Sequence, residues 1–153
     1  MQSGRGSPRN LCPTSGVRTI VNDLKPLLNA PGTTLAIIGA TDHPRKYGGI
    51  IYRDMKAKGF PVLAVNPHRD TVDGDECWNS VVDLPEKPTI AVFVVPATLG
   101  LEVLDDCARA GVENIWIQPG ALSDELRAAL DEGGFNWLAN ACVMVEGRAV
   151  TAH

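Results

Sequence analysis

Residues 39–49 (GATDHPRKYGG) hold the clearest grouping of side chains that could do chemistry. They follow a short apolar run, so Gly39 would let the chain turn tightly at the end of a strand. Backbone N–H groups at the start of the next helix can bind phosphate oxygens, and Thr41 adds a hydroxyl. Arg45 and Lys46 add two cations that can form charge-assisted hydrogen bonds with a polyphosphate. The pattern is typical of a phosphate-binding loop, although basic loop residues also serve as solvated surface charge.

Two features of the sequence distinguish between possible phosphorylated ligands: the glycine spacing in residues 39–49 and the residues at the end of the second apolar run. The dinucleotide fingerprint GxGxxG uses its second glycine for close approach to the pyrophosphate and its third for helix packing. Thr41 and Pro44 stand at those positions. An NAD site also carries an acidic residue at the end of the second strand, where this chain has Asn66 followed by Arg69. The pattern argues against NAD, whereas NADP would fit the second feature but not the missing glycines.

Recognisable catalytic and metal-binding patterns are missing from the sequence. No two of the four cysteines have the close spacing of a zinc site; they are Cys12, Cys77, Cys107 and Cys142. The three histidines, His43, His68 and His153, form no HxxxH pair. There is no nucleophile elbow and no paired-carboxylate site. We expect no metal and no catalytic residues, and we expect a cytoplasmic protein because nothing argues for secretion.

Apolar runs alternate with helical patterns along the chain. Strand-like runs occupy residues 33–39, 61–66, 89–95, 114–117 and 135–138. Apolar side chains recur at helical spacing in residues 47–58, 97–110 and 123–131. Because the strand-like runs are continuously apolar, both of their faces must be covered. The alternation predicts an α/β fold with a Rossmann-like, doubly wound, mostly parallel sheet.

Two segments depart from this alternation. Residues 1–15 are rich in Gly, Ser, Pro and Arg, which predicts a flexible N-terminal tail before a single domain of residues 16–153. Apolar residues from Val17 to Leu28 share one helical face and predict an extra N-terminal helix, with Ser15 as its N-cap. Pro26 should kink that helix or begin a new turn. Residues 68–88 are expected to form a loop with a short strand or helix.

Composition excludes several classes of protein. The 153 residues include 14 Lys+Arg against 18 Asp+Glu, for a net charge of −4, which lacks the basic footprint of a general nucleic-acid-binding protein. At about 150 residues per domain, this length indicates one domain. No apolar run approaches the roughly 20 residues of a membrane span, and no basic N-terminus leads into an apolar stretch. We therefore expect no nucleic-acid partner, no membrane and no secretory signal.

Five motifs taken in order resemble the small CoA-binding proteins of the Rossmann type. They are GATDHPRKYGG, VNPHRD, VFVVP, WIQPGA and a cysteine near the end, and the resemblance covers about residues 17–145. A more distant similarity is to the CoA-binding domain of the succinyl-CoA ligase α subunit. The resemblance implies that the chain binds coenzyme A (CoA) or acyl-CoA as its small-molecule ligand.

The resemblance also implies a role for each matching residue. The loop that would cradle the pyrophosphate comprises Gly39, Ala40, Thr41, Arg45, Lys46 and Tyr47. Asn66 and Pro67 would shape the next turn, and Arg69, with His68 as the second candidate, would face the 3′-phosphate. Val95 and Pro96 would pack against the adenine. Gln118, Pro119 and Gly120 would line the same edge, near the pantetheine.

Cys142 departs from the family pattern, which places Arg before this cysteine and Pro after it. Ala141 and Val143 stand there instead. Two interpretations of Cys142 remain open: a thiol that forms a mixed disulfide with CoA, and a small buried apolar residue.

Binding without catalysis is the leading functional hypothesis. An NAD(P)-linked oxidoreductase, or another nucleotide-dependent enzyme, is the first alternative. A Rossmann interaction module that binds no nucleotide is the second. A homodimer and a monomer are both compatible with the sequence.

Overall fold

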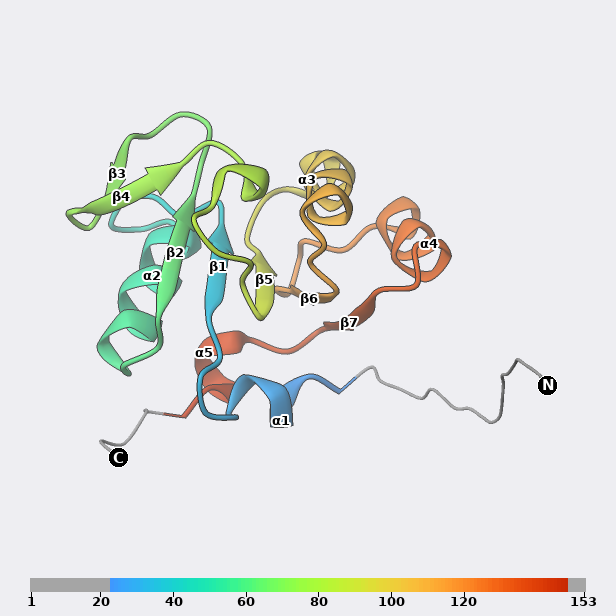
Figure 1. Cartoon of the computed structure of the whole chain (residues 1–153), viewed down its shortest axis with the longest axis horizontal. Coiled ribbons are helices and arrows are strands. Elements are labelled where there is room, and N and C mark those ends of the chain that lie inside the picture. Colours follow the sequence, from blue (N-terminus) through green and yellow to red (C-terminus); the bar gives the residue numbers. More distant parts are fainter. Residues whose placement is uncertain (1–22, 149–153) are drawn as a thin grey trace.

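The computed structural model describes residues 23–148 as one seven-stranded sheet with helices on both faces (Figure 1). The strands are β1 (Leu35–Ile38), β2 (Val62–Val65), β3 (Thr71–Val72), β4 (Asp75–Trp78), β5 (Ile90–Phe93), β6 (Asn114–Ile117) and β7 (Asn136–Ala139). The helices are α1 (Lys25–Leu28), α2 (Tyr47–Ala57), α3 (Ala97–Ala110), α4 (Asp124–Glu132) and α5 (Val143–Glu146), with a 3₁₀ turn, η1 (Val81–Asp83).

The strand order is β3-β4-β2-β1-β5-β6-β7. Only the β3–β4 pair of these strands is antiparallel, and the remaining pairs are parallel. The predicted Rossmann-like, mostly parallel α/β sheet is therefore confirmed.

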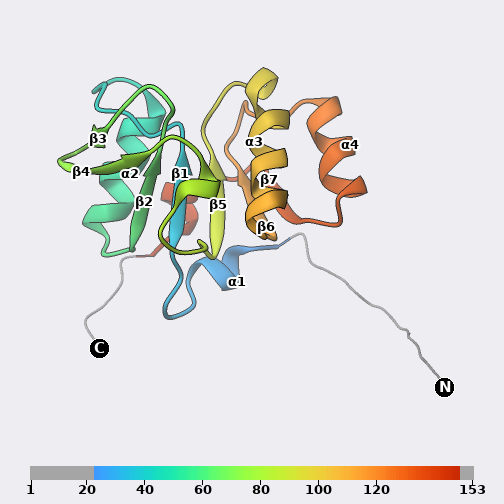
Figure 2. The ribbon, with the colours of Figure 1, turned by 45° about the horizontal axis from the view of Figure 1, so that its top comes forward.

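Alternate residues of the central strands supply two separate apolar cores. Leu35 and Ile37 of β1 pack in the core that also holds residues of α1, α2 and α5. Ala36 and Ile38 pack in the opposite core, with residues of α3 and α4. Figure 2 shows α3 and α4 together on their side of the sheet. Every residue of β1 and β5 is buried, which explains why these strands are apolar throughout.

The helix ends agree with the sequence signals. Ser123 begins α4 as its N-cap, because its Oγ accepts a hydrogen bond of 3.1 Å from the Leu126 N–H. Gly111 ends α3 in the left-handed conformation, at φ 78°. The short helix α5 was not predicted, since four residues give no readable helical period.

The predicted N-terminal helix is described only in part. Residues 17–22, Ser15 and the predicted tail of residues 1–15 lie outside the described residues. Pro26 occupies the first turn of α1, so it begins the helix rather than kinking it. Leu28 is fully buried in the core shared with α2 and α5, which fixes α1 against the sheet.

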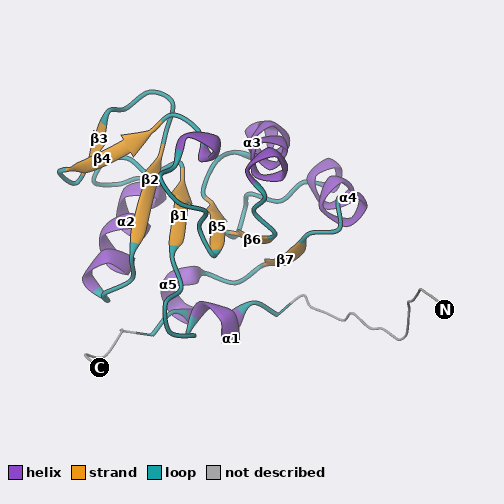
Figure 3. Cartoon of the chain, in the orientation of Figure 1, coloured by secondary structure: helices purple, strands orange, loops and turns teal. Residues whose placement is uncertain are grey.

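Residues 68–88 contain more structure than expected. A β3–β4 hairpin turns at Asp73 and Gly74, which both have positive φ (53° and 80°), and η1 follows it (Figure 3). Asp-Gly is the favoured sequence for such a two-residue turn, so this signal was present in the sequence and was missed. Because β4 pairs with β2, the hairpin extends the sheet rather than forming a loop.

The hairpin is joined to α2 by polar contacts. The Tyr52 hydroxyl donates to Asp75 at 2.7 Å. Lys56 forms ion pairs with Asp73 and Asp75, at 3.1 and 2.8 Å. Burial and the hydrogen bond to Asp75 raise the pKa of Tyr52, so its hydroxyl stays protonated as a donor.

None of the helices within residues 23–148 is long and apolar enough to cross a membrane.

Truncating Leu28 tests whether α1 belongs to the folded domain. We expect Leu28→Ala to lower the free energy of unfolding by about 2–5 kcal/mol, because it opens a cavity at a fully buried position. Leu101→Ala is the matched control, since Leu101 is 43% exposed, and it should change stability by less than about 0.5 kcal/mol. Urea unfolding measures both. Equal stabilities for the two variants would show that α1 does not pack as described.

Candidate functional site

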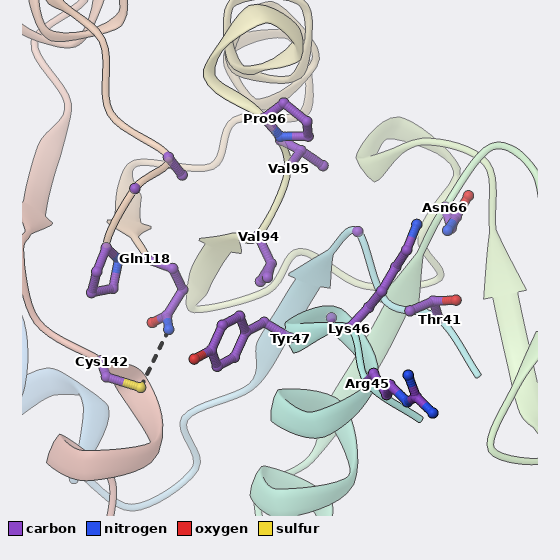
Figure 4. A pocket seen from close by; sticks show the side chains of 15 residues that line it. Thr41, Arg45, Lys46, Tyr47, Asn66, Val94, Val95, Pro96, Gln118 and Cys142 are labelled. Carbon is purple, nitrogen blue, oxygen red and sulfur yellow. Dashed lines mark hydrogen bonds between the residues drawn. The ribbon is translucent and has the colours of Figure 1, made fainter. Parts of the chain in front are cut away.

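A pocket of about 720 Å³ lies at the carboxyl ends of β1 and β5. The chain leaves β1 toward one edge of the sheet and leaves β5 toward the other, so the pocket lies at the point where the strand order reverses. Its walls come from the loops after β1, β2, β5 and β6 and from the starts of α2 and α5 (Figure 4).

The structure brings most of the sequence-predicted residues together in this pocket. Gly39, Thr41, Arg45, Lys46, Tyr47, Asn66, Val95, Pro96, Gln118, Pro119 and Gly120 all line it. Ala40, Pro67 and Arg69 do not. The remaining lining residues, Gly48, Val94, Ala121 and Cys142, were not among the predicted contacts. Gly48, Val94 and Ala121 each adjoin a predicted residue, which is the signal that could have found them.

Glycines allow the backbone to pack closely at the base of the loop after β1. A Cβ atom on Gly48 would lie 1.9 Å from the Gly39 carbonyl oxygen, and one on Gly49 would lie 2.6 Å from the Thr41 carbonyl oxygen. Gly39 has φ 101°, and its own Cβ would lie 2.9 Å from the Val94 carbonyl oxygen. The loop, the start of α2 and the end of β5 therefore meet backbone to backbone.

The close packing of the helix is achieved at different positions from those of the dinucleotide fingerprint. The fingerprint has its third glycine, which permits helix packing, at the position where this chain has Pro44. Gly48 and Gly49 permit that packing from the first turn of α2 instead. The Gly-Gly pair at the end of the GATDHPRKYGG segment carried this signal.

Local hydrogen bonds shape the loop after β1. Thr41 is 7% exposed, and its Oγ1 accepts from the His43 N–H at 3.2 Å. His43 Nδ1 in turn accepts from the Arg45 N–H at 3.2 Å. Asn66 joins this loop to the end of β2, because its Nδ2 donates to the Ala40 carbonyl at 2.9 Å. These bonds form within the chain itself, so the loop is shaped before any ligand binds.

One end of the pocket is positively charged. We call Thr41, Arg45, Lys46 and Asn66 the cationic end. Neither Arg45 nor Lys46 forms an ion pair with another residue of the range 23–148, and none of the lining residues is acidic. The start of α2 also lacks a side-chain cap, and the N–H groups of Tyr47 and Gly48 have no acceptor among residues 23–148. These features together favour an anionic ligand.

Arg69 lies beside the loop but outside the pocket. Its Nη1 is 3.4 Å from Asp42 Oδ2, and its side chain is 37% exposed. Asp42 Oδ1 also accepts from the Asp73 N–H at 2.7 Å. Asp42 therefore ties the loop after β1 to the β3–β4 hairpin and holds Arg69 near the loop.

The other end of the pocket is apolar except for two groups. We call Gln118 and Cys142 the thiol end. Gln118 Nε2 donates to Cys142 Sγ at 3.4 Å, and Gln118 Oε1 accepts from the Val143 N–H at 2.8 Å (Figure 4). The Trp116 indole N–H donates to the Ala141 carbonyl at 2.9 Å and holds the start of α5 in place. Val94, Pro119 and Ala121 supply apolar surface nearby.

Tyr47 lies between the two ends. Its side chain points toward Gln118 and Cys142, and it is 67% exposed (Figure 4).

Within residues 23–148, the structure brings no group of three His, Cys, Asp or Glu side chains into a metal-binding arrangement.

The fold and the pocket define a Rossmann-like domain with a cationic pocket at its topological switch point. The chain belongs to the CoA binding domain family, whose profile matches residues 33–148.

Two solved structures resemble this chain in fold and in sequence. A conserved hypothetical protein from Pyrococcus furiosus has a similar structure, with 43% sequence identity and a TM-score of 0.72, over 74% of this chain and 98% of that one. The dinucleotide-forming acetyl-coenzyme A synthetase 1 of Ca. Korarchaeum cryptofilum, in complex with phosphate and ADP, is 30% identical with a TM-score of 0.66, over 84% of this chain and 31% of that one.

Acetate–CoA ligase [ADP-forming] II of Archaeoglobus fulgidus is a curated relative. It is 32% identical over 94 residues, which are 60% of this chain. The chain spans only 14% of the length of that ligase. The similarity is therefore to one part of a larger enzyme.

Substituting Gly48 tests the backbone contact under the loop. We expect Gly48→Ala to cost about 3 kcal/mol or more, at or beyond the upper end of overpacking effects, because the new methyl would overlap a backbone oxygen. Gly74→Ala is the control: φ at Gly74 is 80° and nothing lies within 4 Å of its added Cβ, so only backbone strain of about 1–3 kcal/mol should appear. Urea unfolding compares them. A Gly48→Ala variant that is as stable as the wild type would contradict the packing described.

Proposed function

We propose that this chain binds coenzyme A or an acyl-CoA in the pocket at the switch point. The observation that carries the proposal is the cationic end, where Arg45 and Lys46 stand without ion-pair partners in residues 23–148 and without acidic neighbours in the pocket wall. A protein of net charge −4 concentrates positive charge at this place, which suits a ligand with several phosphates. Membership of the CoA binding domain family supports the same ligand class.

In the proposed pose, the pyrophosphate lies at the cationic end. The uncapped N–H groups at the start of α2 and the Thr41 hydroxyl would donate to its oxygens, with Arg45 and Lys46 neutralising the charge. The pantetheine arm would pass Tyr47 and reach the apolar thiol end. Adenine would lie against Val95 and Pro96. The pocket volume of about 720 Å³ falls in the range of about 300–1,000 Å³ that is usual for small-molecule sites.

The end of β2 favours CoA over NAD in this pose. An NAD site uses a carboxylate there to bind the ribose diol. Asn66 occupies that position, and both polar atoms of its side chain are engaged, one by the Ala40 carbonyl and the other by the His68 N–H. The nearest side-chain charge that follows is Arg69, which suits a phosphorylated ribose.

Removing the Lys46 ammonium tests the cationic end. We expect Lys46→Ala to weaken CoA binding roughly tenfold, at the lower end of the about 1.5–3 kcal/mol for a hydrogen bond to a charged group, since Lys46 is exposed. Lys87→Ala is the matched control, because it removes the same charge at an exposed position outside the pocket. Isothermal titration calorimetry measures both affinities.

The same calorimetry separates the alternative functions. Equal losses for the two lysine variants would contradict the phosphate pose. Binding of NADPH, with none of CoA, would favour a nucleotide enzyme. No heat with CoA, dephospho-CoA, NAD or NADPH would favour an interaction module.

Arg69 is proposed to recognise the 3′-phosphate of CoA. Its guanidinium pairs with Asp42 over an exposed surface, so it can exchange that partner for a phosphate at small cost. We expect wild-type protein to bind CoA more tightly than dephospho-CoA, and Arg69→Ala to bind the two equally. If the variant still prefers CoA over dephospho-CoA and loses only thermal stability, Arg69 serves only to hold Asp42 in place.

A further inference from the structure

The thiol end of the pocket carries polar groups that phosphate binding does not use. Gln118 and Cys142 lie across the pocket from Arg45 and Lys46, with Tyr47 between them (Figure 4). A site that only held phosphates would not need a buried amide and a thiol at its apolar end.

The Gln118 amide has one N–H that is free to bond with a ligand. Its Oε1 is fixed by the Val143 N–H at 2.8 Å, which orients Nε2 toward the pocket. One Nε2 hydrogen goes to Cys142 Sγ at 3.4 Å, and the second has no acceptor among residues 23–148. The side chain is only 6% exposed and lines the pocket, so an acceptor for this second hydrogen has to come from what the pocket holds. A ligand with a carbonyl group close to its thiol would supply that acceptor.

Cys142 differs from the other thiols within residues 23–148. Cys77 and Cys107 are buried at 7% and 0% exposure, and burial raises the pKa of both thiols, that of Cys107 to about 12. Neither lines the pocket. Cys142 is half-buried, lines the pocket and accepts a hydrogen bond from Gln118. A thiol in this position can meet the sulfur of a bound ligand.

We propose that Cys142 and Gln118 form a thiol–disulfide exchange site for the disulfide form of the ligand, an inference that rests on the proposed binding of CoA. The Cys142 thiol loses its proton to solvent, and its thiolate attacks one sulfur of a CoA disulfide. A bond forms between Cys142 Sγ and that sulfur, the original S–S bond breaks, and the second CoA leaves as a thiolate. The ligand disulfide is itself the oxidant. The second Nε2 hydrogen of Gln118 donates to a pantetheine carbonyl beside the reacting sulfur.

Mass spectrometry of the full chain tests this exchange. Reduced protein is incubated with CoA disulfide or, separately, with glutathione disulfide. We expect one CoA adduct that maps to the peptide with Cys142 and that dithiothreitol removes. It should form at least about tenfold faster than the glutathione adduct, because binding of the phosphates raises the local concentration of the disulfide.

Variants link the adduct to the pocket. Cys142→Ser and Cys142→Ala should both lose it, with circular dichroism showing that each variant is folded. Lys46→Ala should slow the reaction with CoA disulfide by a larger factor than the reaction with glutathione disulfide. Lys87→Ala should change neither rate.

Other results would overturn the inference. These are an adduct on Cys12 in place of Cys142, no adduct at all, or equal rates of adduct formation with CoA disulfide and glutathione disulfide. Calorimetry of the reduced wild-type protein with CoA separates the two proposals. Binding without exchange overturns the thiol–disulfide site alone, whereas an absence of binding overturns the proposed function and this inference together.

Discussion

The close packing of the first turn of α2 beneath the loop after β1 is the constraint on which the site depends. Hydrogen atoms at Gly48 and Gly49 are all that fits there, because a methyl group on Gly48 would reach the Gly39 oxygen at 1.9 Å. This approach brings the N–H groups of Tyr47 and Gly48, at the start of α2, to the carboxyl end of β1, in the centre of the sheet. The positions of Thr41, Arg45 and Lys46 follow from it, and Asn66 then fixes the loop from the side of β2.

The pocket combines two chemical environments that different parts of the chain supply. The cationic end is built on the loop between β1 and α2, whose exposed cations have no carboxylate beside them in the pocket wall. The thiol end is built from the loop after β6 and the start of α5, where Gln118 links both segments. A ligand that is anionic at one end and carries a thiol at the other matches this arrangement, and CoA is such a molecule.

The sequence predicted the sheet because buried parallel strands leave continuous apolar runs, and β1 and β5 are buried at every position. It predicted most pocket residues because ligand-binding loops follow the strands directly. It left Cys142 open between a thiol beside the ligand and a buried apolar residue, since that position depends on how the chain returns after β7 and on hydrogen bonds between distant residues. Arg69 shows the same limit: its pairing with Asp42 joins residues 27 positions apart.

The short helix α5 makes the two ends of the pocket unequal in local stability. It has a single turn, and it is held from outside by Gln118, Trp116 and Asn29, the last of which donates to the Glu146 carbonyl and accepts from the Arg148 N–H. Such a segment can open without unfolding the sheet, so its amides should exchange with deuterium much sooner than those of β1 and β5. A ligand in the pocket would then slow amide exchange in α5, although α5 lies far along the chain from the loop after β1.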